Sequence, residues 1–196
     1  MSTKIRRVNL AAGPGAGKST IAAWLFAAMK IICNEQNIDL KIEHVQERLK
    51  AEVWAGRKNF DRWDQWDIAL RQFNKEYTLL KSGVDIIITD SPLVIYPYYA
   101  KRSNTPCINE LANLVEVFER DYPSLTIFVE RGDKTYRSHG RNETLEEAKI
   151  ADNGIKQYLM ESGTNFVVLP FDQRRSILAR ILSTYGLDPN LATAYN

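Results

Sequence analysis

The sequence predicts an α/β fold in which a parallel sheet is covered by helices on both faces. Short runs rich in β-branched residues alternate with longer runs at helical spacing, as in successive β-α units. The first β-rich run leads directly into a glycine-rich loop and then a helix. No repeat, low-complexity tract or linker interrupts the chain, so we expect residues 1–196 to form one domain.

Five runs are expected to be strands because each is short and either apolar or alternating. The third is apolar up to the acid Asp90, as expected of a strand buried on both faces. The second alternates polar and apolar residues, which favours a place near the edge of the sheet. The expected strands are residues 6–11, 39–45, 85–90, 125–130 and 166–169.

The segments between these strands carry helical signals. Thr144 with Glu147 would form a capping box, and Ser82-Gly83 would end a helix. We expect helices at residues 18–34, 46–58, 61–81, 108–120, 144–161 and 172–185, with a whole or broken helix at 92–100.

Two details of this assignment can be tested by a structure. Trp63 and Trp66 share a helical face with Leu70, and we expect that face to belong to the core. The tail from Asp188 is expected to be mobile. The helix at 108–120 serves either the core or a dimer interface.

The glycine-rich loop has the composition of a phosphate-binding loop, or P-loop. Residues 12–20 read Ala-Gly-Pro-Gly-Ala-Gly-Lys-Ser-Thr. Backbone N–H groups of such a loop surround phosphate oxygens, and the helix that follows directs its positive end at them. Lys18 would reach the β- and γ-phosphates, and the Ser19 hydroxyl would bind Mg²⁺. A glycine-rich turn that merely ends in Lys-Ser is the alternative.

The sequence therefore predicts a nucleoside triphosphate site with Mg²⁺. The expected binding residues are Gly13, Gly15, Ala16, Gly17, Lys18, Ser19 and Thr20.

Two acids follow predicted strands next to this loop. Asp90, after four largely apolar residues, fits the second motif of nucleoside triphosphatases and could hold Mg²⁺ directly or through water. Its alternative is simple turn chemistry in Asp-Ser-Pro. Glu47 follows the second strand and could accept the proton of an acceptor hydroxyl. Its alternative is an acid favoured at a helix N-terminus, with Glu43 or Asp90 as the base instead.

The segment 131–143 is rich in arginine and glycine. Phosphoryl transfer spreads negative charge over equatorial oxygens, and guanidinium groups on a closing loop can neutralise it. We therefore expect a lid that carries Arg131, Arg137 and Arg141. A basic surface loop is the alternative, and His139 is expected to be a loop residue and not a base.

Composition narrows the class of protein. The net charge of +2 does not by itself indicate nucleic-acid binding. No apolar run approaches the roughly 20 residues of a membrane span, and residues 1–7 lack the apolar region of a signal peptide. Cys33 and Cys107 are isolated, as expected of free thiols in a reducing compartment. We expect a cytoplasmic protein without a membrane partner.

On these motifs the chain resembles the small P-loop kinases of bacteriophages, which are distant relatives of thymidylate and deoxynucleoside kinases. The matching pieces are residues 13–20, Ile-Thr-Asp-Ser-Pro-Leu at 88–93, and the lid pattern Arg131, Tyr136 and Gly140-Arg141 with Glu146-Glu147-Ala148 behind it. The resemblance covers nearly everything up to residue 170.

This resemblance implies a five-stranded parallel sheet of order 2-3-1-4-5, Mg-ATP as donor, and an acceptor site formed by the helices at about residues 46–81. For a phage-encoded protein the location would be the host-cell cytoplasm. The oligomeric state, monomer or homodimer, stays open.

One branch of these kinases acts on 5-hydroxymethyluracil in phage DNA, a step of thymine hypermodification. The segment that follows Glu47 interleaves basic and aromatic residues, which suits a DNA strand with an extruded base. The acceptor is thus a nucleotide-type group, either this DNA base or a free nucleoside or nucleoside monophosphate. The expected acceptor-binding residues are Arg48, Trp54, Arg57 and Lys58.

Two other classes compete with a kinase. A nucleotide-dependent switch of the small-GTPase type needs Asp-x-x-Gly and Asn-Lys-x-Asp, and Asn74-Lys75 is followed by Glu76-Tyr77 instead. A ring-forming ATPase needs a further helical domain. The third class is a nucleic-acid-binding module with an inactive P-loop, against which the intact Lys18, Ser19 and Asp90 argue.

Overall fold

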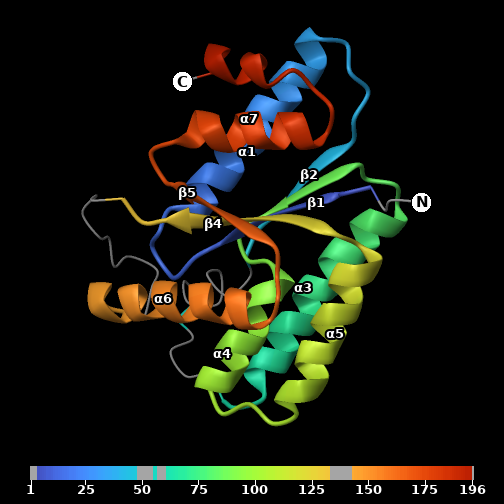
Figure 1. Cartoon of the computed structure of the whole chain (residues 1–196). Coiled ribbons are helices and arrows are strands. Elements are labelled where there is room, and N and C mark those ends of the chain that lie inside the picture. Colours follow the sequence, from blue (N-terminus) through green and yellow to red (C-terminus); the bar gives the residue numbers. More distant parts are fainter. Residues whose placement is uncertain (1–3, 48–54, 57–60, 133–142, 196) are drawn as a thin grey trace.

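Five parallel strands form the centre of the computed structural model (Figure 1), which describes residues 4–47, 55–56, 61–132 and 143–195. The strand order β2-β3-β1-β4-β5 confirms the order implied by the resemblance. Val8 lies opposite Ile88 on one neighbour and Leu125 on the other. The strands are β1 (Arg7–Ala11), β2 (Ile42–Val45), β3 (Ile86–Thr89), β4 (Ser124–Glu130) and β5 (Phe166–Pro170).

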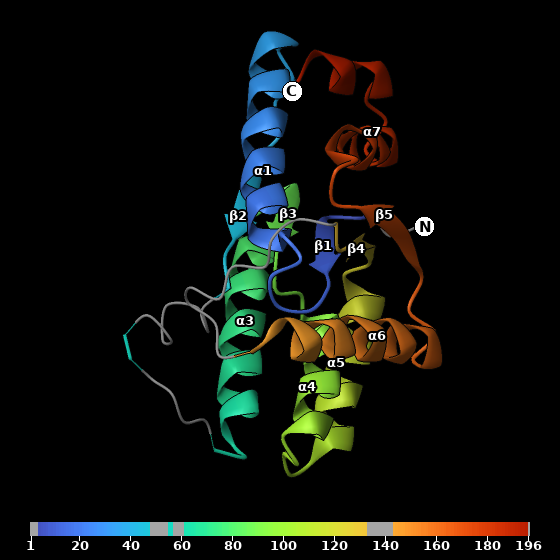
Figure 2. The same cartoon turned by 90° about the vertical axis from the view of Figure 1, so that its left-hand side faces the viewer.

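Helices cover both faces of this sheet, as the alternating pattern predicted (Figures 1 and 2). One face carries α1 (Lys18–Glu35) and α7 (Arg174–Thr184). The other carries α3 (Asp64–Lys81), α4 (Tyr96–Arg102), α5 (Ile108–Asp121) and α6 (Leu145–Glu161). A single 3-10 turn, η1 (Leu93–Ile95), precedes α4, so the helix expected near 92–100 is a broken one.

Local sequence signals account for several of the helix boundaries. The capping box of α6 is present: Glu147 N donates to the Thr144 hydroxyl, and the Glu147 carboxylate accepts from Thr144 N. Ser82 caps the C-terminus of α3, and Gly83 follows it at φ 79°. Helix α5 buries Leu111, Val115 and Phe118 in the core. Of the two roles expected for this helix, its apolar face therefore serves the core.

The prediction for the apolar face of α3 is wrong for Trp63 and Leu70, while Trp66 packs against the core as expected. Trp63 is 55% exposed and Leu70 is 42% exposed, while Gln72 and Glu76 are buried. Trp66 is half-buried and donates from its indole to the Pro106 carbonyl at 2.9 Å. The helix is rotated relative to the predicted orientation because its polar residues face a buried charge. Apolar periodicity does not detect such a charge.

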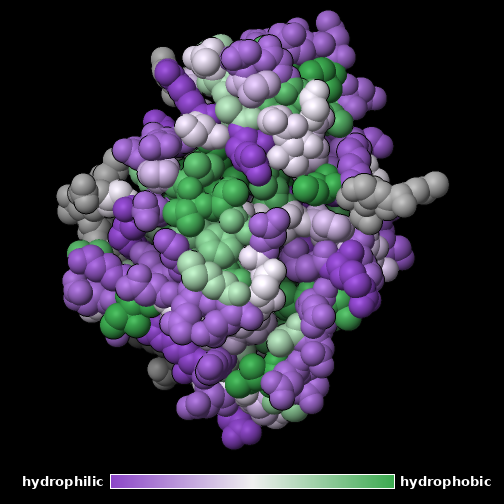
Figure 3. All heavy atoms as spheres, viewed as in Figure 1, coloured by the Kyte–Doolittle hydropathy of each residue, from purple (hydrophilic) through white to green (hydrophobic). Residues whose placement is uncertain are grey.

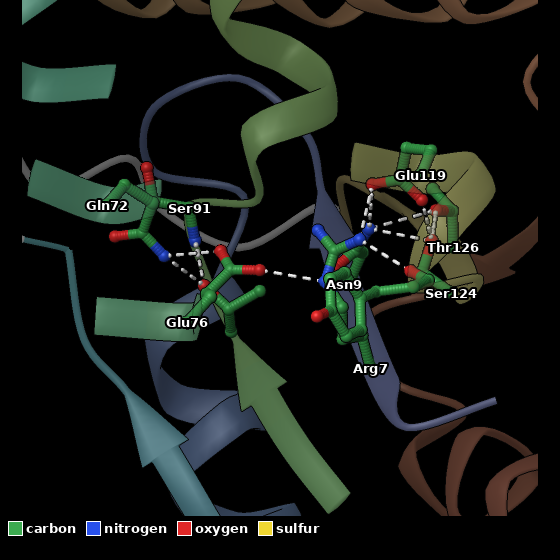
Figure 4. A network of polar contacts seen from close by, with 10 residues as sticks. Arg7, Asn9, Gln72, Glu76, Ser91, Glu119, Ser124 and Thr126 are labelled. Atoms are coloured by element: carbon green, nitrogen blue, oxygen red, sulfur yellow. Dashed lines mark hydrogen bonds and ion pairs between the residues drawn. The ribbon is translucent and has the colours of Figure 1, made fainter. Parts of the chain in front are cut away.

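That charge belongs to Arg7, the first residue of β1, whose side chain is fully buried. Its Nε donates to Glu76 on α3 at 2.9 Å, and its Nη1 donates to Glu119 on α5 at 2.9 Å (Figure 4). The guanidinium also lies 4.4 Å from the centre of the Phe118 ring. A buried charge is tolerated only with such partners, so Arg7 fixes both helices against the sheet.

Two further expectations need correction. Gln46 and Glu47 are not helical, and Ala55-Gly56 forms a turn; the rest of the helix expected at 46–58 lies outside the described residues. The tail that was expected to be mobile is packed on the fold, because residues Pro189–Ala194 form the 3-10 helix η2 and bury Ala192. Tyr195 extends this packing by donating from its hydroxyl to Glu35 on α1 at 2.6 Å.

The surface reflects this layering. Viewed as in Figure 1, the residues along α6 are mostly hydrophilic, and a hydrophobic area lies at the centre, over the β5 edge (Figure 3). Val168 of β5 is 36% exposed. The site described below does not use this area.

Removing Glu76 tests the buried pair. We expect Glu76→Ala to lower the free energy of unfolding by about 3–5 kcal/mol, because Arg7 keeps its buried charge and loses a partner. Asp67→Ala on the same helix is the control: its pair with Arg71 is exposed, so the change should stay within about 1 kcal/mol. Urea unfolding measures both. Equal losses for the two variants would contradict the assigned role of Arg7.

Candidate functional site

The site begins with the loop between β1 and α1, which other elements approach closely. Gly17 caps α1 at φ 96°, and any side chain there would collide with the Phe171 ring. A Cβ at Gly13 would lie 2.7 Å from both the Ala148 carbonyl and an Asp152 oxygen on α6. Glycine is therefore required at both positions, for conformation at one and for space at the other.

The side chain of Lys18 folds back onto this loop. Its Nζ donates to the carbonyls of Ala12 and Gly13, both at 2.9 Å. Burial lowers the pKa of Lys18, while the charges of Glu47, Asp90 and Asp152 act to raise it and Arg131 acts to lower it. The charges that act on the ammonium group are thus those of three carboxylates and a guanidinium.

Asp90 and Glu47 come together at the carboxyl ends of two neighbouring strands. Asp90 directly follows β3 and is 2% exposed, and its Oδ1 accepts from Glu47 N at 3.0 Å. Because β2 pairs with β3, this bond fixes the chain after β2 against the chain after β3. Glu43 lies within β2 and lines a hollow of about 660 Å³ with Asn74 and Lys75 of α3. The structure therefore brings Glu47, and not Glu43, to Asp90.

Asp152 on α6 is a site residue that the sequence did not identify. Its Oδ1 accepts from Gly13 N at 2.6 Å, and its Oδ2 accepts from Arg131 Nε at 2.8 Å. Arg131 in turn donates from Nη2 to the Pro14 carbonyl at 2.7 Å. Asp152 and Arg131 together clamp the loop from the side of β4 and α6. No local motif in the sequence marked Asp152.

The helix after Asp90 adds phenols to the same region. The Tyr96 and Ser91 hydroxyls lie 3.0 Å apart, and burial raises the pKa of Tyr96. Burial also raises the pKa of Tyr99, and the charge of Glu47 contributes in the same direction. Both tyrosines are therefore neutral hydrogen-bonding groups beside the carboxylates.

The oxygen donors present fit a magnesium ion. Ser19 lies in the first turn of α1 and Asp90 follows the adjacent strand β3. Mg²⁺ prefers oxygen ligands and is usually held by one or two carboxylates together with substrate phosphates and waters. Within the described ranges, no group of three or more His, Cys, Asp or Glu residues forms a metal cluster.

The remaining expected site residues are placed as follows. Ala16 is buried, Gly15 has φ 76°, and Thr20 is exposed on the first turn of α1. The other lid and acceptor-site residues lie outside the described part of the chain: Arg48, Trp54, Arg57, Lys58, Tyr136, Arg137, His139, Gly140 and Arg141.

None of the helices in the described ranges combines the length and apolarity needed to cross a bilayer.

Residues 7–176 match the protein family described as AAA domain. No curated protein matches the sequence.

Two solved structures share the fold. One is the crystal structure of NadR protein in complex with NAD and AMP-PNP, with a TM-score of 0.70 and 14% identity over 94% of this chain and 50% of that chain. The other is thymidylate kinase from Ehrlichia chaffeensis, with a TM-score of 0.61 and 12% identity over 94% of this chain and 100% of that chain. The chain spans half the length of the NadR structure. Together these matches establish a P-loop fold like that of nucleotide kinases.

Asp152→Ala tests the clamp on the loop. We expect about tenfold weaker nucleotide binding or more, because two charge-assisted hydrogen bonds are lost and Gly13 is released. Asp152→Asn should fall between this variant and the wild type, since its amide oxygen can still accept from Gly13 N. The control Glu146→Ala removes an exposed carboxylate from the same helix. Calorimetric titration with ADP measures all three, and wild-type affinity in Asp152→Ala would contradict the clamp.

Proposed function

The chain belongs to the AAA domain family, and we propose that it is an ATP-dependent kinase that phosphorylates a nucleotide-type acceptor. The observation that carries this proposal is the cluster of Lys18, Glu47 and Asp90 at the P-loop. Lysine serves the donor phosphates. Asp90, which accepts from the backbone N–H of Glu47, provides a carboxylate for the metal, and the side chain of Glu47 provides one for the proton.

The presence of two carboxylates favours a kinase over a nucleotide-dependent switch. A switch needs only groups that bind the triphosphate and position water, whereas a kinase must also orient an acceptor hydroxyl. Glu47 follows the edge strand β2, and its backbone N–H is bonded to Asp90. The NadR structure holds NAD and AMP-PNP, and the second similar structure is a thymidylate kinase. Both support a nucleotide-type acceptor beside an ATP donor.

In the proposed reaction the acceptor oxygen forms a bond to the γ-phosphorus as the bond to the β,γ-bridging oxygen breaks. The acceptor proton passes to the Glu47 carboxylate, and ADP leaves. Lys18 neutralises charge on the β- and γ-phosphates, and Arg131 holds the loop that surrounds them. Ser19 and Asp90 would hold Mg²⁺, which supplies further neutralisation of the phosphate charge. Arg137 and Arg141 are proposed to act on the transferred group.

As the acceptor we propose the 5-hydroxymethyl group of 5-hydroxymethyldeoxyuridine in DNA. The basic and aromatic residues of the segment 48–58 support this choice, because phosphates need cations and an extruded base needs a stacking partner. A free nucleoside or nucleoside monophosphate is the competing acceptor, favoured by the likeness to thymidylate kinase.

Labelled ATP separates these acceptors. The protein is incubated with γ-labelled ATP and a duplex containing 5-hydroxymethyluracil, a matched thymine duplex, or a panel of mononucleotides. We expect label on the hydroxymethyluracil duplex alone. Label on mononucleotides alone would replace the DNA acceptor with a free nucleotide. Hydrolysis without transfer to any acceptor would overturn the kinase in favour of a switch.

Lys18→Ala should abolish transfer and leave the fold intact. The hydrogen bonds described for Lys18 go to carbonyls of its own loop, so its removal should leave the sheet and its covering helices in place. We expect the melting temperature to stay within about 4 °C of the wild type. Transfer assays and thermal unfolding measure the two effects. Full turnover in this variant would refute the assigned site.

Glu47→Gln should separate proton transfer from nucleotide binding. The amide keeps the size of the side chain and cannot accept the proton, so we expect kcat to fall about 10²–10⁴-fold with little change in ATP affinity. Glu43→Gln is the matched control, because it makes the same change within the same strand region. A larger loss in Glu43→Gln would reassign the base to Glu43.

A further inference from the structure

The buried contacts of Arg7 continue to the turn that carries Asp90. The second carboxylate oxygen of Glu76 accepts from Gln72 Nε2 at 2.8 Å. The same nitrogen donates to the Thr89 hydroxyl oxygen at 3.0 Å. That oxygen also accepts from Ser91 N at 3.3 Å. A continuous series of hydrogen bonds therefore runs from Arg7, at the start of β1, through α3 to the residues on both sides of Asp90. Figure 4 shows its labelled members.

Every group in this chain is removed from solvent. Thr89 is fully buried, Gln72 is 3% exposed and Ser91 is 5% exposed. In such surroundings a polar group that loses its partner is costly, so each bond constrains its neighbour. The Thr89 hydroxyl receives two N–H groups, which account for its two acceptor sites. Its orientation is therefore fixed, and with it the turn between Thr89 and Ser91.

The carboxylate of Asp90 leaves this turn toward the site. Its own contact is with Glu47 N, and its charge acts on Lys18. The chain of buried groups thus holds the backbone on both sides of Asp90 and leaves the side chain to the site.

A second branch of the same network provides a comparison. Asn9 Nδ2 donates to Ser124 at 2.9 Å and to Thr126 at 3.3 Å, and Ser124 donates to Glu119 at 2.7 Å. This branch runs toward β4 and ends at Glu119, and none of these bonds reaches Lys18, Glu47 or Asp90. Thr126 is 1% exposed, so it matches Thr89 in residue type and in burial.

We propose that Thr89, held by Gln72, is a positioning residue that sets the direction of the Asp90 carboxylate for the metal-bound nucleotide. The inference rests on the proposed function, because it takes Asp90 to face the nucleotide. Thr89 itself touches neither donor nor acceptor in this account. Its effect is transmitted through the turn.

The test removes the hydroxyl and keeps the shape. Thr89→Val replaces the hydroxyl by a methyl group, Thr89→Ser keeps the hydroxyl, and Thr126→Val makes the first change in the other branch. Gln72→Met is a second route to the same effect. For each variant the affinity for ADP is measured by calorimetry with and without Mg²⁺, kcat and KM are measured with ATP, and thermal unfolding reports the fold.

Mg²⁺ should raise the ADP affinity of Thr89→Val by a factor about tenfold smaller than in the wild type. We also expect kcat to fall and the ADP affinity without Mg²⁺ to change little. Thr89→Ser should restore the gain. Thr126→Val should be destabilised to a similar extent as Thr89→Val and should keep the gain.

Three outcomes would overturn the proposal. A wild-type Mg²⁺ response in both Thr89→Val and Gln72→Met would show that the turn is fixed without them. An equal loss in Thr126→Val would show a merely structural network. If Mg²⁺ did not change the ADP affinity of the wild-type protein, Asp90 would have no magnesium ion to hold. If no transfer occurs but Mg²⁺ still tightens ADP binding, the proposed kinase reaction is wrong while the role of Thr89 can still be measured. The experiment therefore separates the proposed function from the proposed role of Thr89.

Discussion

The close approach of backbone and side chains around the loop between β1 and α1 constrains the rest of the structure. Helix α6 contacts the loop at Gly13, and the chain after β5 contacts it at Gly17. Asp152 satisfies the N–H of Gly13, and Lys18 satisfies two carbonyls on the inner side. The loop shape is therefore imposed by tertiary contacts as well as by its own glycines, and the sheet, α1 and α6 must be in register for it to form.

Charge balance explains why so many polar groups are buried on the face that carries α3 to α6. Around the loop, two cations face three carboxylates. At the start of β1, Arg7 forms ion pairs with Glu76 and Glu119. Buried ions need partners, and here the two clusters are connected through Gln72 and Thr89. A buried ion pair adds little net stability by itself, so its connection to the Asp90 turn gives the cluster a further role.

Much of the fold could be predicted from the sequence, because the strands are short apolar runs and the P-loop has a distinctive composition. The rotation of α3 could not, since apolar spacing pointed to Trp63 and Leu70 while the buried charge of Arg7 required Glu76. Within the site, Lys18 was predicted from the P-loop motif, and Glu47 and Asp90 were predicted from strand ends. Asp152 was missed because it lies 139 residues from Gly13 in the chain. Contacts at such separation leave no local pattern.

The most direct test of the central claim is a calorimetric titration of the full chain with ATP, with and without Mg²⁺. The account predicts saturable binding that Mg²⁺ tightens, because the loop, Lys18 and Asp90 would then act on one triphosphate. The absence of any Mg²⁺-dependent adenine-nucleotide association at about millimolar concentration would contradict it.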